Sequence, residues 1–200
     1  QTALRLSARG STAWAAPSMA ETPGLKAVDM FRAVEDGRIK ALWIICTNPV
    51  ASVADRQSVI EALQAAELVI TQDAYLDTET NRYADILLPG ALWAEAQGVM
   101  INSERNLTLM QKAVDAPGET LPDWQIIAEM AGAMGYADAF DYASSEEVFE
   151  ELKQFWNPKT GYDLRGVSYA RLARTPVQWP APPLDPATEH DDGRNPIRYL

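Results

Sequence analysis

The chain has 200 residues, enough for one ordinary domain or for one domain with an appendage. It is 47% hydrophobic and 22% charged, so it can bury a sizeable core. Its 28 acidic and 17 basic residues give a net charge of −11. This balance argues against a protein that binds nucleic acid or an anionic membrane through a basic face.

The chain has one cysteine, Cys46, and one histidine, His190. A single cysteine excludes an intrachain disulfide framework and a four-cysteine iron–sulfur cluster within these residues. No apolar run approaches the roughly 20 residues that span a bilayer. We therefore expect a cytoplasmic protein with no membrane and no nucleic-acid partner. The start at Gln1, without an initiator methionine, indicates a piece of a longer polypeptide.

The first half of the chain alternates predicted helices and strands. The run Thr22-Pro23-Gly24 is typical of a helix start, because a capping hydroxyl precedes a proline. The continuous apolar run at 41–46 is typical of a strand buried on both faces of a parallel sheet. In chain order, the predicted elements are a helix that ends at Gly37, a strand at 41–46, a helix from Asp55 to Ala66, and strands at 68–71 and 86–88.

The second half is less regular. Two short strands are predicted at 99–101 and 107–110, a helix at 123–134, and a helix that a capping box opens at Ser144. Six of the thirteen prolines fall between Pro176 and Pro196, which indicates a surface-hugging or linking tail.

These elements predict an α/β fold with a Rossmann-like, doubly wound, mainly parallel sheet and flanking helices, followed by an irregular Pro-rich C-terminal extension. We expect three segments along the chain. Residues 1–22 form a loose lead-in, 23–156 the Rossmann-like segment, and 157–200 the extension.

Polar residues follow the first two predicted strands. Asn48 comes after the first, and Gln72 and Asp73 come at the end of the second. Ligands of doubly wound sheets bind outside the carboxyl ends of the strands. An aspartate accepts two hydrogen bonds side by side, which suits a guanine edge or a ribose diol. The alternative is that Asn48 and Asp73 only form turns. The Gly-x-Gly-x-x-Gly and Gly-Lys-Ser/Thr loops of dehydrogenases and P-loop proteins are absent from the sequence.

Four other acidic residues, Asp77, Glu79, Asp85 and Glu95, are weaker candidates for a metal site or an acid–base pair. Carboxylates beside turns are more often solvated or capping. Cys46 ends an apolar strand, and free cysteines of this kind are most often small core residues. We therefore assign no catalytic residue and no metal ligand within the chain.

A longer set of strings occurs in a fixed order. They are Trp43-Ile44-Ile45-Cys46-Thr47-Asn48-Pro49, Gln72-Asp73, Thr78-Glu79-Thr80, Ala84-Asp85-Ile86-Leu87-Leu88-Pro89, Trp93-x-Glu95-x-x-Gly98, Asn102-Ser103-Glu104-Arg105 and Asp123-Trp124. Over about residues 23–180, this set resembles the molybdopterin oxidoreductase family. Within that family, strings such as Val177-Gln178-Trp179-Pro180 are most similar to assimilatory nitrate reductases, with formate dehydrogenases as near neighbours.

The resemblance implies a fragment of the central region of a catalytic subunit that reduces nitrate, and an isolated fragment without activity. It implies a molybdenum bis(molybdopterin guanine dinucleotide) cofactor and an iron–sulfur cluster in an N-terminal part outside this chain. The implied partners are the remaining domains of the same polypeptide, a small oxyanion substrate and an electron-donor protein or domain. Carried over by position, the contacts to the dinucleotide would be Asn48, Gln72, Asp73 and Asp123.

One departure from the family pattern concerns Ala96. Many relatives have Glu-Lys-x-Gly where this chain has Glu95-Ala96-Gln97-Gly98, so the lysine that contributes to the cofactor site is missing. Arg105 could compensate, or Glu95 and Arg105 could pair with each other. The alternatives that remain are another molybdopterin oxidoreductase, such as a formate dehydrogenase, and a metal-free scaffold subunit of the same fold.

Overall fold

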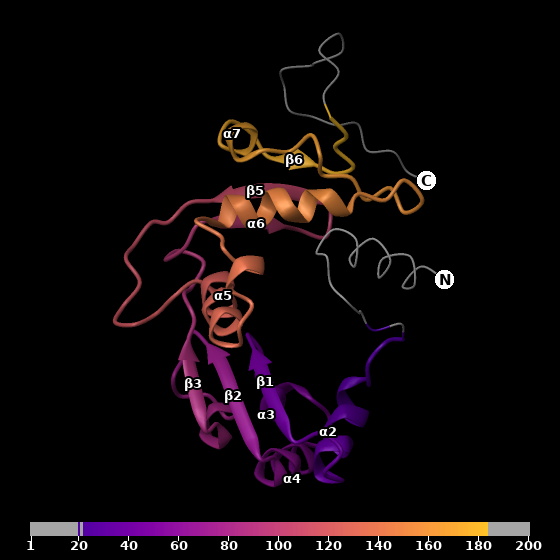
Figure 1. Ribbon diagram of the computed structural model, residues 1–200, viewed down its shortest axis with the longest axis vertical. Helices are drawn as coiled ribbons and strands as arrows, with labels where there is room; N and C mark the ends of the chain where they lie inside the picture. The colour runs from indigo at the N-terminus through magenta and orange to yellow at the C-terminus, as the bar shows by residue number, and fades with distance from the viewer. Residues whose placement is uncertain (1–19, 21, 184–200) are drawn as a thin grey trace. The chain divides into compact units, whose positions relative to one another are not determined.

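The computed structural model describes residue 20 and residues 22–183 (Figure 1). Contacts between residues divide these into two compact units. We call residues 23–95 and 115–130 the parallel-sheet unit, and the described residues 20, 22, 96–114 and 131–183 the antiparallel-sheet unit. Each unit contains part of the expected 23–156 segment, and the expected segment boundaries stay a prediction.

The parallel-sheet unit contains the predicted α/β arrangement. Its sheet has the order β1-β2-β3, and both pairings are parallel. The strand arrows point the same way in Figure 1. The strands are β1 (Ala41–Ile45), β2 (Leu68–Asp73) and β3 (Ile86–Pro89), and the helices beside them are α2 (Ala27–Glu35), α3 (Pro49–Ser52), α4 (Arg56–Ala65) and the short 3-10 turn η1 (Asn81–Tyr83). The α/β class expected from the sequence is confirmed.

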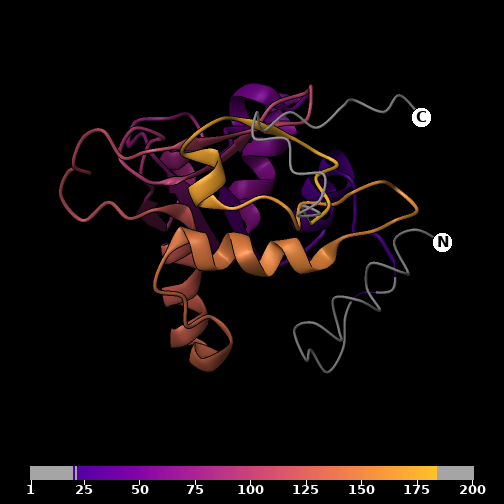
Figure 2. The same ribbon diagram turned by 90° about the horizontal axis from the view of Figure 1, so that it is seen from above.

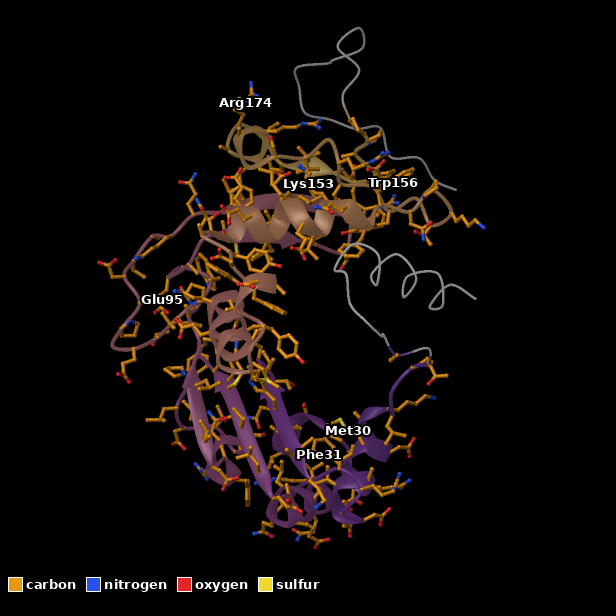
Figure 3. The ribbon with its side chains drawn as sticks, in the orientation of Figure 1. Met30, Phe31, Glu95, Lys153, Trp156 and Arg174 are labelled. Atoms are coloured by element: carbon orange, nitrogen blue, oxygen red, sulfur yellow. The ribbon has the colours of Figure 1, made fainter. Side chains whose placement is uncertain are left out.

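The core of this unit lies between the sheet and helices α2 and α4. Phe31 on α2 is buried, and Figure 3 shows it beside its neighbour Met30. Burial of each large apolar side chain contributes about 1.5–3 kcal/mol. The other buried core members are Val34, Leu42, Ile44, Val50, Val59, Ala62, Leu63 and Val69.

The two predicted helix starts in this unit have different outcomes. The start at Thr22-Pro23 is wrong, because α2 begins at Ala27 after an extended Lys26 that makes no side-chain cap. Leu25 is exposed, so a longer helix would bury no further apolar surface at that position. The Asp55 cap is confirmed: the Ser58 N–H donates to its Oδ1 at 3.4 Å and the Ser58 hydroxyl to its Oδ2 at 2.8 Å.

The antiparallel-sheet unit contains a three-stranded sheet of order β4-β5-β6. Arg105, with φ of 66°, lies in the turn between β4 and β5, and the two predicted short strands are confirmed as an antiparallel pair. The elements are β4 (Gly98–Ile101), β5 (Asn106–Met110), β6 (Val177–Gln178), the helices α6 (Ser145–Leu152) and α7 (Tyr169–Leu172), and the 3-10 turns η2 (Ala137–Ala139) and η3 (Lys153–Phe155). Figure 2 shows α6 lengthwise.

Helix α6 has the predicted capping box. The Glu147 N–H donates to the Ser144 hydroxyl at 3.3 Å. The Glu147 carboxylate accepts from the N–H of Ala143 at 2.7 Å, one residue earlier than in the usual box. Helix α5 (Asp123–Ala133) is also confirmed, and its first residues belong to the parallel-sheet unit.

The interpretation of residues 157–200 as a surface tail is wrong for its described part. Residues 157–183 carry few regular elements, yet they supply most of the core of the antiparallel-sheet unit. The buried members from this stretch are Leu164, Val167, Tyr169, Leu172, Val177 and Ala181. His190 lies outside the described residues. No helix in the part of the chain that the structure describes has the length and apolar character to cross a membrane.

Candidate functional site

The carboxyl ends of the three parallel strands are held in line by backbone hydrogen bonds. The Cys46 N–H donates to the Gln72 carbonyl at 2.9 Å, and the Gly90 N–H donates to the Asp73 carbonyl at 3.0 Å. These bonds continue the register in which Ile45 pairs with Gln72 and Asp73 pairs with Pro89. We call Cys46, Gln72, Asp73, Gly90 and Asp123 the carboxyl edge.

Asp123 is brought to this edge by the segment that precedes α5. The Leu121 N–H donates to the Pro89 carbonyl at 3.2 Å, and the Ala91 N–H donates to the Leu121 carbonyl at 2.8 Å. Leu121 thereby forms a parallel bridge with Gly90 beside β3. Asp123 is the first residue of α5, where a carboxylate is stabilised by the helix dipole.

Gln72 is joined directly to Asp123. The side chain of Gln72 is buried, with a relative exposure of 1%, and its Nε2 donates to Asp123 Oδ1 at 2.6 Å. Its Oε1 is buried and has no hydrogen-bond partner within the described residues. A buried amide with one satisfied end fixes the orientation of the carboxylate that it contacts. Gln72 therefore holds Asp123 in place.

Gly90 makes room for this carboxylate. A Cβ placed on Gly90 would lie 3.1 Å from Asp123 Oδ1 and 3.7 Å from the backbone carbon of Asp73. The close packing explains why a residue without a side chain stands at this point.

Asp73 forms a turn and remains partly exposed. Its Oδ1 accepts a hydrogen bond from the Tyr75 N–H at 2.9 Å, so the turn interpretation is correct for this oxygen. Its Oδ2 makes no hydrogen bond with any residue that the structure describes. One carboxylate oxygen can therefore accept from a ligand while the other keeps the loop closed.

Asn48 belongs to a different hydrogen-bond network. Its Nδ2 donates to Glu79 Oε2 at 2.7 Å, and its Oδ1 accepts from the Thr80 hydroxyl at 2.6 Å. The buried Thr80 hydroxyl also accepts from the Val50 N–H at 3.2 Å. Donation from Asn48 lowers the pKa of the Glu79 carboxyl. Both ends of the Asn48 amide are thus occupied, and they fix the turn after β1.

The structure corrects the expectation for Cys46. It is exposed rather than part of the core, and its backbone enters the left-handed region, with φ of 55°, directly after β1. Partial burial and the neighbouring Asp123, by its charge and as hydrogen-bond acceptor, raise the pKa of the thiol to about 11, with a smaller contribution from the charge of Asp73. The thiol is therefore neutral at physiological pH.

Sequence reasoning also missed Glu79 and Thr80 as partners of Asn48.

The weaker acidic candidates have structural roles, as expected for carboxylates beside turns. Asp77 pairs with Arg82, Asp85 accepts from the Val69 N–H, and Glu95 accepts from the Leu92 N–H. Among residues 20 and 22–183, no group of three or more His, Cys, Asp or Glu side chains is arranged to hold a metal ion. In the antiparallel-sheet unit, the guanidinium of Arg105 lies 5.2 Å from the ring centre of Trp179.

The chemistry of the carboxyl edge is that of an acceptor surface. Asp73 and Asp123 make no ion pair with a lysine or arginine in the described part of the chain. Carboxylates without a cation favour ligands that donate N–H or O–H groups over phosphate groups. The edge suits the base or the sugar of a nucleotide better than its phosphates.

The raised pKa of Cys46 predicts slow alkylation. A thiol of pKa about 11 is almost entirely protonated at pH 8, so its reaction with iodoacetamide is expected to be roughly a hundredfold slower than that of a free cysteine, despite its exposure. The folded state binds this proton more tightly than the unfolded state does. The resulting contribution to the free energy of unfolding is therefore fully present below pH about 8.5 and is lost as the pH rises towards 11. Peptide mapping of alkylated Cys46 over pH 7–10 measures the rate. A rate at pH 8 equal to that of free cysteine would contradict the assignment, and Asp123→Asn should speed the reaction.

The fold defines an α/β protein of the Rossmann-like type, and comparisons with known proteins define its family. The family model "Molybdopterin oxidoreductase" matches residues 4–133. The chain is 43% identical over 159 residues to a nitrate reductase of Synechocystis sp., covering 79% of this chain and 22% of that protein. It is 36% identical to the assimilatory nitrate reductase catalytic subunit of Bacillus subtilis, covering 81% of this chain and 23% of that protein.

The chain belongs to the molybdopterin oxidoreductase family. It is also 41% identical to an F420-dependent formate dehydrogenase subunit alpha of Methanocaldococcus jannaschii, covering 73% of this chain and 21% of that protein. Among solved structures, acetylene hydratase from Pelobacter acetylenicus shares the fold, with a TM-score of 0.58 and 24% identity over 74% of this chain and 20% of that one. The chain spans about a fifth of the length of the curated relatives that it matches.

Proposed function

We propose that the polypeptide containing this segment is a molybdenum-dependent nitrate reductase of nitrate assimilation, located in the cytoplasm. The similarity to several nitrate reductases, at 35–43% identity, supports the reaction. The proposed role of the segment is to bind the guanine-nucleotide part of a molybdopterin guanine dinucleotide. Its proposed partners are the other domains of the same polypeptide, a small oxyanion substrate and an electron-donor protein or domain.

The observation that carries the binding role is the acceptor character of the carboxyl edge. Guanine presents adjacent N–H donors, and a ribose presents two hydroxyls, so either group matches the free Oδ2 of Asp73 and the oriented carboxylate of Asp123. The edge lies outside the carboxyl ends of parallel strands, where sheets of this type bind nucleotides. The residues present therefore fit the nucleoside end of such a cofactor.

This fit separates the chemistry that the cofactor supplies from the roles of the protein residues. When bound, the molybdenum and its dithiolene ligands supply the two-electron oxygen-atom transfer. The residues of this chain bind and orient: Asp73 and Asp123 accept hydrogen bonds from the nucleoside, and Gln72 holds Asp123. Asn48 holds the turn after β1 through Glu79 and Thr80.

A formate dehydrogenase is the second candidate, because a relative of that name is 41% identical over most of this chain. The iron–sulfur cluster proposed for the enzyme lies outside these residues under both assignments. A metal-free scaffold subunit is the third, and Ala96 in place of the usual lysine is the residue that favours it.

The molybdenum content of the full-length polypeptide, purified without oxygen, tests the proposal. We expect about one molybdenum and two guanine nucleotides per chain, with viologen-linked reduction of nitrate. Formate oxidation without nitrate reduction would transfer the assignment to a formate dehydrogenase. Absence of molybdenum, in cells that load other molybdoenzymes, would favour the scaffold. The isolated 200-residue fragment is expected to have no redox activity.

Replacement of Asp73 tests the binding role directly. In the full-length enzyme, Asp73→Ala is expected to lower the guanine-nucleotide content several-fold, while the KM for nitrate of the molecules that remain loaded stays within about twofold. Asp77→Ala is the matched control, because Asp77 lies in the same loop but pairs with Arg82 at 2.9 Å. An Asp73→Ala enzyme that keeps its full guanine-nucleotide content and shows only a raised KM for nitrate would contradict the binding role of Asp73.

A further inference from the structure

Strand β1 lies at one edge of the parallel sheet, and its outer side has no partner among the described residues. In a parallel ladder, alternate residues bond to one neighbouring strand and the residues between them face the other way. On β1 the alternate set that faces β2 includes Cys46, whose N–H donates to the Gln72 carbonyl at 2.9 Å. The backbone groups that point away from β2, and that bond to no residue that the structure describes, are therefore those of Ala41, Trp43 and Ile45.

The sequence of this outer edge has none of the features that keep an exposed strand from pairing. Natural edge strands carry lysine or proline, a bulge or an inward-pointing charge. Strand β1 reads Ala-Leu-Trp-Ile-Ile, with neither a charge nor a proline, and its register with β2 is unbroken along its whole length. An apolar edge of this kind is a template for a further strand.

Helix α2 also presents apolar surface that the three strands do not cover. Its Phe31 and Val34 are buried in the same cluster as Val59 and Leu63 of α4, so the two helices cover the same face of the sheet. Figure 1 shows α2 on the side of β1 opposite to β2. Val28 precedes Phe31 by three positions on the same side of α2, yet it is 44% exposed. The three-stranded sheet thus leaves part of the apolar side of α2 uncovered.

The handedness of strand connections indicates where a further strand would lie. The connection from β1 to β2 passes through α4 on one face of the sheet. Connections between parallel strands of one sheet are almost always right-handed. Because α2 covers the same face as α4, a parallel strand that leads into α2 must lie beside β1 on the side away from β2. This position is the unpaired outer edge.

We propose that the outer edge of β1 pairs with a parallel strand of the same polypeptide that precedes α2 in chain order. The chain spans about a fifth of the length of its curated relatives, so a polypeptide of their length has ample chain to supply this strand. A second copy of β1, related by a two-fold axis, would pair antiparallel and would not be connected to α2. The pairing does not depend on the reaction that the polypeptide catalyses.

Hydrogen exchange in the full-length polypeptide, resolved to single amides, tests the pairing. The N–H groups of Leu42 and Ile44 belong to the set that faces β2, and they are the internal reference. The N–H groups of Trp43 and Ile45 are expected to exchange within roughly tenfold of this reference, because they too donate within the sheet. Exchange of Trp43 and Ile45 that is more than roughly tenfold faster than the reference would show that β1 is an edge strand and would overturn the proposal.

Photo-crosslinking from position 41 identifies the strand that pairs with β1. The side chain of Ala41 is exposed, so Ala41→p-benzoylphenylalanine in the full-length polypeptide is expected to link to a peptide N-terminal to α2 in the same chain. A mixture of unlabelled and isotope-labelled protein separates links within one chain from links between two copies. Gln57→p-benzoylphenylalanine, at an exposed position of α4, is the control and is not expected to reach that peptide. A link to β1 of a second copy, a link only to residues C-terminal to β1, or no link would overturn the proposal.

Discussion

Leu164→Ala is expected to lower the free energy of unfolding of the antiparallel-sheet unit by about 2–5 kcal/mol. Leu164 is 1% exposed and belongs to the same buried cluster as Leu107, Phe149 and Val177. Removal of its branched side chain loses apolar burial and leaves a cavity, because neighbours in a packed core relax only in part. Urea unfolding followed by tryptophan fluorescence measures the loss as a lower midpoint at unchanged slope.

Leu152→Ala is the matched control for this prediction. Leu152 lies in the same unit and has the same side chain, but it is 46% exposed. Its replacement is expected to change the free energy of unfolding by no more than about 0.5–1 kcal/mol. Equal effects of the two substitutions would contradict the packing of residues 157–183 as part of the core.

Gly90→Val is expected to remove most of the guanine nucleotide from the full-length enzyme, by about tenfold or more. Even a single Cβ at this position would meet Asp123 Oδ1 at 3.1 Å, and valine adds two methyl groups. The carboxylate must then move away from Gln72 Nε2, and the amide loses its 2.6 Å partner. An unpaired buried amide also costs about 1–3 kcal/mol of stability. Nucleotide released by acid and the midpoint of thermal unfolding are the two measurements.

Gly24→Val provides the comparison. Apart from its chain neighbours, no residue that the structure describes lies within 4 Å of a Cβ placed on Gly24, and its φ is outside the left-handed region. We expect full nucleotide content in this variant. If Gly90→Val retained its nucleotide as well, Asp123 would not be the group that binds it.

The elements that the sequence predicted well are those with local signals. The apolar runs of β1 and β2 predicted strands, and both strands are present. The expected burial on both faces is wrong for β1, where Leu42 and Ile44 are buried but Ala41 and Ile45 are exposed. Asp55 and Ser144 start helices because their side chains accept from backbone N–H groups three residues later. Such signals depend only on residues that are close in the sequence.

Other features could not be predicted from local patterns. Asn48 stays a predicted contact of the dinucleotide, but its bond to Glu79 joins residues 31 positions apart, and no local pattern shows it. The positive φ of Cys46, directly after β1, has no signal in the sequence either, and the side chain is exposed rather than part of the core. The buried residues of 157–183 have neither helical nor strand periodicity. The prolines of this stretch therefore led to the prediction of a surface tail, and its contribution to the core was missed.

The interleaving of the two units has a consequence for synthesis on the ribosome. The chain passes from one unit to the other near residues 95, 114 and 130. The parallel-sheet unit is therefore incomplete until residue 130 has left the exit tunnel, since Leu121 and Asp123 complete its carboxyl edge. A nascent chain that stalls before this point exposes the unpaired backbone of β3 and the buried amide of Gln72. We expect the unit to become resistant to protease only in nascent chains that extend beyond this length.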